Sequence, residues 1–170
     1  MNMKKLAYLT FSLGVFALLF AACGKYEDGP TFSLASKKAR VANEWVIEKN
    51  IADGVEQELT GYEQYYSYIF EKDGTGKFKV EAHTQTYNGV DVDVAASETA
   101  IEWRFDDKKE KIQMRMADSN GQFEDWDDEW STILRLTSSE FWLQDQYSYD
   151  SDGDGTDDVT VTSETHLKSK

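Results

Sequence analysis

The sequence is poor in the residue types that most often carry catalysis. Its 170 residues include one cysteine, one proline and two histidines. A single cysteine excludes an internal disulfide and any cysteine-cluster metal site. Gly-x-Ser-x-Gly, His-Glu-x-x-His and glycine-rich phosphate loops are all absent from the chain. His83 and His166 fall on predicted strands, where we expect surface positions. We therefore predict a protein that is not an enzyme and has no catalytic residues.

Positive charge is scarce as well. The chain has 18 Lys and Arg residues against 32 Asp and Glu residues, a formal net charge of −14. An acidic surface repels phosphate backbones, so we exclude nucleic acid as a partner. Aromatic residues make up 14% of the chain. This content is too high for a disordered acidic chain, because the rings supply a core. We expect one folded domain that is a monomer.

The one long apolar run lies at the N-terminus. Lys4 and Lys5 precede apolar residues 6–22, and Cys23 follows. The run is shorter than the ~20 residues of a membrane-spanning helix, so it predicts a signal peptide over residues 1–22. Ala21-Ala22-Cys23 resembles a bacterial lipobox, which implies lipidation of Cys23, whereas the alternative is an ordinary signal peptide with an incidental cysteine. Removal of residues 1–22 leaves 16 basic and 32 acidic side chains, a net charge of −16.

The predicted mature chain begins with an anchor and a tether. Acyl chains on Cys23, such as palmitate, would hold the protein at a membrane, because each buried methylene contributes ~0.8 kcal/mol. Residues 23–32 include the only proline, Pro30, and form a short tether. Residues 33–170 are the predicted domain.

Hydrophobic periodicity predicts a mainly β domain. Residues 33–43 favour a short helix with Ser33 or Ser36 as its cap. After the helix the period is two residues, and turn signals recur every ~8–12 residues, as in an antiparallel barrel or sandwich. About eight strands are expected, over residues 45–49, 65–70, 77–83, 100–105, 112–116, 131–136, 140–147 and 158–166.

Three short runs carry a resemblance to a known family. They are the tryptophan that opens the first strand in Ala42-Asn43-Glu44-Trp45, the Asp73-Gly74-Thr75 turn, and the run from Trp103 to Asp107. With the order of elements, they resemble a lipocalin-like lipoprotein domain of Gram-negative envelopes over residues 33–168. Asn43 departs from the lipocalin signature, which has glycine there. The resemblance implies an all-β, lipocalin-like (calycin-type) fold: an eight-stranded antiparallel up-and-down barrel with a short N-terminal helix. It also implies a small hydrophobic or amphipathic ligand. We expect an outer-membrane location, on either the periplasmic or the cell-surface face.

Alternation places several aromatic side chains inside such a barrel. Eight strands enclose just enough space either for the barrel's own side chains or for one small ligand, so a filled and a hollow barrel both remain open. Flexible thioethers suit a variable ligand wall. The residues predicted to contact a ligand are Tyr66, Tyr68, Trp103, Phe105 and Met114. The alternative function is a filled barrel that contacts an envelope protein or a glycan through its acidic and aromatic loops.

An acidic loop near the C-terminus predicts a weak Ca²⁺ site. Calcium takes six to eight oxygen ligands, and a calcium loop supplies them at alternate positions around a glycine bend. The candidate ligands are Asp150, Asp152, Asp154, Thr156 and Asp158, with Gly155 at the bend. Val161 stands where the pattern has a glutamate, and a weak affinity of ~10⁻⁴–10⁻³ M is expected. A solvated turn is the alternative, since turns also favour Asp and Gly.

A second acidic segment covers residues 124–129 and is bordered by aromatic rings. Trp126 lies within it and Trp130 follows it. We interpret the segment as a solvated loop. The alternative is a sugar-binding lip in which exposed indole faces stack on sugar rings.

Overall fold

The structure is a computed structural model that describes residues 35–87, 89–151, 153 and 155–170. The predicted signal peptide, Cys23 and the tether over residues 23–32 lie outside these residues, as do Asp152 and Asp154. No helix among the described residues is long and apolar enough to cross a membrane. In chain order the elements are α2 (Lys37–Val41), β1 (Glu44–Ala52), β2 (Val55–Gln57), the 3₁₀ helix η1 (Glu63–Tyr65), β3 (Tyr66–Phe70), β4 (Thr75–Val80), β5 (His83–Tyr87), β6 (Val90–Val94), β7 (Ser97–Phe105), β8 (Lys111–Met116), β9 (Ser131–Leu136), β10 (Glu140–Tyr149) and β11 (Val159–Ser169).

Eight antiparallel strands close into a barrel. The order is β1-β3-β4-β7-β8-β9-β10-β11, and β11 pairs with β1 to complete the circle. Neighbours in the barrel are also neighbours along the chain, apart from the short additions β2 and β5–β6, so the topology is up-and-down. Closure removes the two edge strands that an open sheet would have. The predicted eight-stranded antiparallel barrel with a short N-terminal helix is confirmed, and it is consistent with a lipocalin-like architecture.

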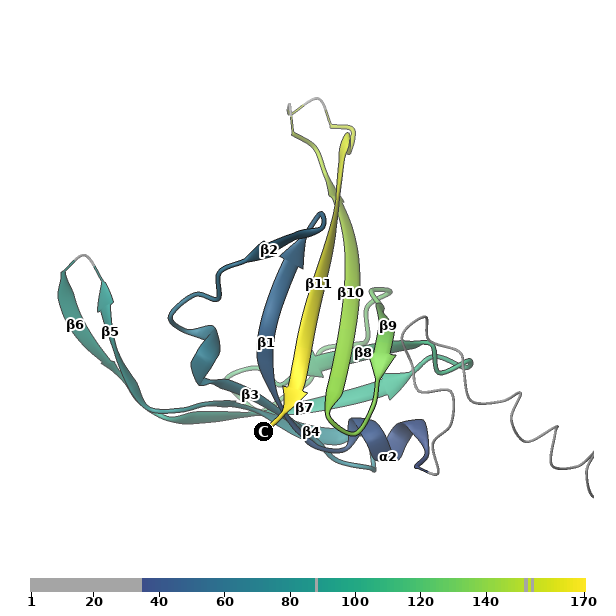
Figure 1. The fold of residues 1–170 in the computed structure, drawn as a ribbon, viewed down its shortest axis with the longest axis horizontal. Helices are drawn as coiled ribbons and strands as arrows, with labels where there is room; N and C mark the ends of the chain where they lie inside the picture. The colour runs from purple at the N-terminus through teal and green to yellow at the C-terminus, as the bar shows by residue number, and fades with distance from the viewer. Residues whose placement is uncertain (1–34, 88, 152, 154) are drawn as a thin grey trace, which may run out of the picture.

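A β5–β6 arm leaves the barrel between β4 and β7 (Figure 1). The sequence predicts one strand over residues 77–83, whereas β4 ends at Val80 and a separate two-stranded hairpin begins at His83. Val90 and Val92 of this hairpin are exposed, and Asp91 and Asp93 accept hydrogen bonds from threonines of β5. The hairpin therefore has no apolar face that the barrel core buries, and it extends away from the barrel instead of joining its wall.

The helix α2 and its flanks close one end of the barrel. Ser36 is the N-cap, and its Oγ accepts a hydrogen bond from Ala39 N, so the helix is shorter than predicted. Arg40 is buried and donates from Nη1 to the Leu136 carbonyl at 3.0 Å. Asn43, at the position of the signature glycine, donates from Nδ2 to the Ser138 carbonyl at 3.3 Å. These bonds tie the helix to the β9–β10 turn.

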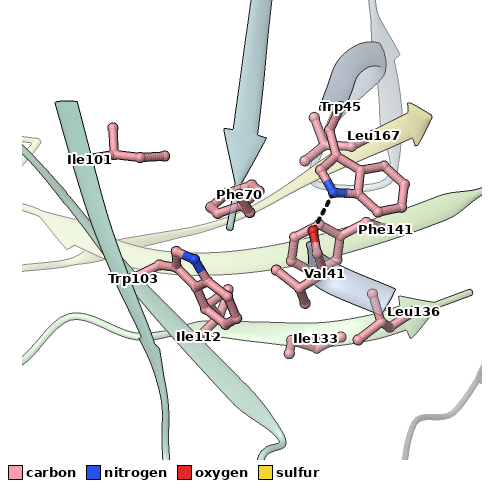
Figure 2. Packing of buried hydrophobic residues seen from close by; sticks show 10 residues of the cluster. All are labelled: Val41, Trp45, Phe70, Ile101, Trp103, Ile112, Ile133, Leu136, Phe141 and Leu167. Atoms are coloured by element: carbon pink, nitrogen blue, oxygen red, sulfur yellow. Dashed lines mark hydrogen bonds between the residues drawn. The ribbon is translucent and has the colours of Figure 1, made fainter. Parts of the chain in front are cut away.

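The closed half of the barrel is filled by a packed core (Figure 2). Trp45 is fully buried, and its Nε1 donates to the Val41 carbonyl at 2.8 Å. Its ring packs against Phe141, with ring centroids 5.5 Å apart. Gly76 permits close strand packing, because an added Cβ would lie 2.1 Å from the Ile69 carbonyl oxygen. The core residues are Val41, Trp45, Phe70, Ile101, Trp103, Ile112, Ile133, Leu136, Phe141 and Leu167.

Candidate functional site

A small cavity lies inside the barrel, beside the packed core. Its volume is about 190 Å³, and it is lined by Tyr68, Phe70, Met114, Ser131, Leu143, Asp145, Thr165 and Leu167. These residues come from β3, β8, β9, β10 and β11. Register explains how they meet, because Leu143 is paired with Thr165 and Phe141 with Leu167 on the inner face. A cavity of ~150 Å³ holds a benzene molecule, so this one has room for a single ring.

The cavity is open on the side of the β8–β9 seam. These two strands share only two register pairs, Lys111 with Thr132 and Ile112 with Ser131. Met114 and Met116 are paired with inward-facing residues of β7, yet they are 37% and 41% exposed. Solvent therefore reaches the inner face where β8 extends beyond its pairing with β9.

Asp145 connects the inner cavity to an outer groove. The groove has a volume of about 470 Å³ and is lined by Lys111, Asp128, Glu129, Trp130, Thr132, Gln144, Asp145, Gln146 and Tyr147. Asp145 also lines the inner cavity. Its carboxylate makes no hydrogen bond or ion pair to another described residue. A half-buried carboxylate without a partner favours a donor or a cation beside it.

The inner cavity otherwise offers neutral polar groups. Burial raises the pKa of the Tyr68 hydroxyl, and the nearby Tyr66 and Glu63 raise it further, because all three disfavour the phenolate. Tyr68 is therefore a neutral phenol that can donate a hydrogen bond. Glu63 itself accepts a hydrogen bond from Asn50 Nδ2 at 2.6 Å. Thr165 and Ser131 add hydroxyl groups to the lining.

The structure brings together only two of the five residues predicted to contact a ligand. Tyr68 and Met114 line the inner cavity. Trp103 belongs to the packed core at 4% exposure. Phe105 packs edge-on against Trp103, with centroids 5.3 Å apart, and borders a surface hollow beside Arg104. Tyr66 packs against Phe78 and borders a different cavity, at the base of the arm.

Residues of β10 and β11 that line the cavity were not predicted from the sequence. Leu143 and Asp145 follow Phe141 at intervals of two residues, and Thr165 is paired with Leu143. The signal was present in the period-two pattern, because alternation from the apolar Phe141 and Leu143 also turns Asp145 inward. An acid on the inner face of an otherwise apolar stretch is the feature to look for.

The predicted calcium loop is described only in part. Asp150 accepts hydrogen bonds from the backbone N–H groups of Gly153 and Gly155, at 2.6 and 2.7 Å. Asp158 accepts from the backbone N–H and the hydroxyl of Ser151, both at 2.8 Å, and these bonds lower its pKa. Among the described residues no group of three or more metal-binding side chains converges. Because Asp152 and Asp154 lie outside the described residues, calcium binding by this loop stays a prediction.

The second acidic loop is held against the barrel by its tryptophans. The Arg104 guanidinium lies over the rings of Trp126 and Trp130, at 4.3 and 5.2 Å from their centroids. The Arg115 guanidinium lies 4.4 Å from the Trp126 centroid and 5.3 Å from that of Phe123. Both indoles are half-buried. A sugar-binding lip requires free indole faces, and here guanidinium groups occupy faces of both rings.

The expectation that both histidines are surface residues is wrong for His166. This residue points outward from β11 but is only 4% exposed. Its ring stacks on Trp142, with centroids 4.1 Å apart, and its Nε2 lies 3.0 Å from Glu164 Oε2. Stacking between neighbouring strands buries the ring without turning it toward the core. The expectation came from the place of each histidine on a predicted strand and did not include the paired position of Trp142.

Comparisons with known proteins add no family to this geometry. No protein-family model matches the chain, and no curated protein matches it. The eight-stranded barrel therefore rests on the structure alone, and the lipocalin-like family stays a prediction.

Proposed function

We propose that the protein is a lipid-anchored envelope lipoprotein that binds a small amphipathic ligand in its barrel without transforming it. One observation carries the proposal: the barrel is packed at its helix end but keeps a solvent-connected cavity beside that core, lined by Tyr68, Met114, Leu143, Asp145 and Thr165. Ligand sites in proteins are typically apolar clefts with a few polar groups that fix orientation. This cavity has that composition.

The cavity chemistry favours a single-ring ligand with a cationic or donor head group. Met114, Leu143 and Leu167 supply apolar contacts for a ring-sized body. Asp145 has no described partner and would accept hydrogen bonds from an ammonium or hydroxyl group at the junction with the outer groove. A carboxylate head group would face both Asp145 and the net negative charge of the chain, so anionic amphiphiles bind least well.

Lipid anchoring rests on the sequence. Cys23 and the signal peptide that precedes it support attachment to the outer membrane. The chain joins the barrel through α2, at the closed end. In this proposal the tether therefore meets the barrel at its packed end, which leaves the cavity accessible. Cys23→Ala should abolish incorporation of labelled palmitate and release the protein from the membrane fraction. Retention of the variant in membranes would contradict the anchor.

Matched probes test the ligand class directly. Native mass spectrometry and isothermal titration calorimetry of the purified protein should detect one-to-one binding of 2-phenylethylamine, weaker binding of 2-phenylethanol, and least binding of 3-phenylpropionate. The three probes share a ring and differ in the head group. Absence of saturable binding by all three at millimolar concentration, together with no co-purifying organic mass, would contradict a ligand-binding barrel.

A charge-matched pair of variants locates the head group. Asp145→Asn should weaken binding of the amine roughly tenfold or more, because it removes a charge-assisted hydrogen bond. Asp128→Asn makes the same change of net charge in the outer groove, and Asp128 does not line the inner cavity. It should leave the preference for the amine in place. Equal effects of both variants would indicate a general field effect and no site at Asp145.

An interaction module is the second candidate, and the β5–β6 arm favours it. The arm leaves the barrel wall and exposes Val90 and Val92. Apolar side chains on a projecting hairpin suit contact with another protein. Substitution of both valines by threonine should leave probe binding intact under the ligand-binding function. It should weaken assembly with an envelope partner under the alternative function.

A further inference from the structure

A second cavity lies where the β5–β6 arm leaves the barrel. Its volume is about 410 Å³, and it is lined by Tyr62, Tyr66, Val80, His83, Gln85, Val94 and Ser97. It shares no lining residue with the inner cavity. One wall comes from Tyr62 at the start of η1 and from the barrel strands β3, β4 and β7, and the other wall comes from the arm. The cavity is therefore a separate site whose shape depends on how the arm meets the barrel.

Two hydrogen-bond acceptors on residues that line this cavity have no donor within the described part of the chain. His83 Nδ1 lies 2.8 Å from the Glu81 carbonyl oxygen, which can only accept, so Nδ1 carries the proton and Nε2 of the neutral ring is an acceptor. His83 Nε2 and Gln85 Oε1 are both buried and have no hydrogen-bond partner among the described residues. The two residues lie two positions apart on β5 and share one face of the strand.

Two buried acceptors without donors indicate a ligand that donates hydrogen bonds. Buried polar groups in proteins are almost always hydrogen-bonded, and a buried group left without a partner destabilises the free state. A ligand with two adjacent donors would satisfy both acceptors at once. The gain is larger than for an ordinary surface contact, because neither acceptor gives up an existing bond to a described residue or to bulk water.

The remaining lining selects an uncharged ligand with an apolar face. No Asp, Glu, Lys or Arg lines the cavity, so a charged ligand would lose its hydration without a compensating charge. The Tyr65 ring stacks on His83 at 3.9 Å between centroids and fixes the imidazole. Tyr62 and Tyr66 present rings to the cavity, and Tyr62 is 38% exposed.

We propose that this cavity binds a neutral saccharide. Hydroxyl groups of a pyranose ring donate to His83 Nε2 and Gln85 Oε1, and the C–H face of the sugar packs against the tyrosine rings. A sugar combines adjacent neutral donors with an apolar face, which matches the lining. Both acceptors have under 1 Å² of exposed area, so the ligand reaches them when a lining side chain turns aside. Tyr62 is the more exposed of the two lining tyrosine rings.

Ligand-observed NMR of the purified protein tests the site. The probes are the methyl glycosides of glucose, galactose, mannose and N-acetylglucosamine at millimolar concentration. At least one should show saturable transfer of magnetisation from the protein. Gln85→Leu and His83→Phe should each weaken its binding roughly threefold to tenfold, since each removes one neutral hydrogen bond. His83→Phe keeps a ring that can stack on Tyr65.

A control on the opposite face of β5 separates the site from general effects on the arm. Thr84 donates from Oγ1 to Asp93 Oδ1 at 2.8 Å and does not line the cavity. Thr84→Ala should leave sugar binding unchanged. The proposal is overturned if none of the four glycosides binds the folded protein. It is also overturned if Gln85→Leu and His83→Phe both retain full affinity. Binding of 2-phenylethylamine by the inner cavity is independent of either result.

Discussion

Truncation of Trp103 should remove a large part of the free energy of unfolding of the domain. The indole is 4% exposed and lies edge-on to Phe70 and Phe105, with ring centroids 5.8 and 5.3 Å away. Its Nε1 donates to the carbonyls of Glu71 and Thr75, at 3.1 Å each, and thereby fastens the β3–β4 turn. Loss of a buried Trp side chain typically costs ~3–5 kcal/mol. Because domains of this size are stable by ~5–15 kcal/mol, Trp103→Ala should leave a marginal fold.

Urea unfolding followed by far-ultraviolet circular dichroism measures this cost. Trp126→Ala is the matched control, because it removes the same side chain from the outer loop. Trp126 contacts two guanidinium groups, and exposed cation–π contacts contribute ~0.5–1 kcal/mol each, so about 1–2 kcal/mol is expected. Trp103→Phe should cost about 1–3 kcal/mol through the two carbonyls left without a donor. Equal losses for Trp103→Ala and Trp126→Ala would refute the assignment of Trp103 to the core.

Three further predictions concern Gly76, Tyr68 and the acidic loop over residues 150–158. Gly76→Ala should destabilise the barrel by at least ~1–3 kcal/mol in urea unfolding, because its Cβ would collide with the Ile69 carbonyl; unchanged stability would contradict the strand spacing. Tyr68 has a raised pKa, so the native state retains this proton above pH ~10 while the unfolded chain loses it, and stability falls as pH rises. Tyr68→Phe should show a shallower fall between pH 9 and 11, and identical slopes would place the hydroxyl in water. Finally, calcium titration followed by calorimetry should give saturable one-to-one binding that is lost when Asp152 and Asp154 become Asn, whereas unsaturable binding would leave the loop a solvated turn.

Alternation in the sequence was sufficient to predict the eight barrel strands, but it predicted neither β2 and the β5–β6 hairpin nor the depth of each side chain. Trp103 and Met114 are paired across β7 and β8 and both face inward. One is buried and the other is 37% exposed. The difference arises because α2 covers one end of the barrel and because β8 separates from β9 beyond Ile112. Neither feature is encoded in a local pattern of apolar and polar residues.

A bulge in β1 made it impossible to predict from alternation which face of the strand each later residue occupies. The pairing of β1 with β11 shifts between Ile47 and Lys49, so that Asn50 is paired with the inward-facing Thr165. An uninterrupted alternation from Trp45 would have turned Lys49 inward and Asn50 outward. A one-residue insertion reverses the face of every later side chain in a strand. The polar contact between Asn50 and Glu63 near the cavity depends on this reversal.

Residues 124–129 form an exposed acidic loop as predicted, but their local composition did not reveal what holds Trp126. Their acidic side chains are exposed, and the half-buried position of Trp126 follows from two arginines that are distant in sequence. Arg104 and Arg115 are close because β7 and β8 pair Arg104 with Gln113 and Glu102 with Arg115. Outward arginines on adjacent strands, followed by an aromatic-rich loop, are a pattern from which such a contact can be predicted.

A filled core and a ligand cavity occupy different halves of the same barrel. At the packed end, the buried side chains of Trp45, Trp103 and Phe141 stabilise the fold. This packing therefore allows the other end to carry groups outside the packed core, including the exposed methionines and Asp145, which has no partner among the described side chains. From the sequence, a filled barrel and a hollow barrel are alternatives, because alternation says only that a side chain points inward and not how deep it lies. If the division by depth is correct, ligand contacts belong to the residues beside the seam, and substitutions there should change binding more than stability.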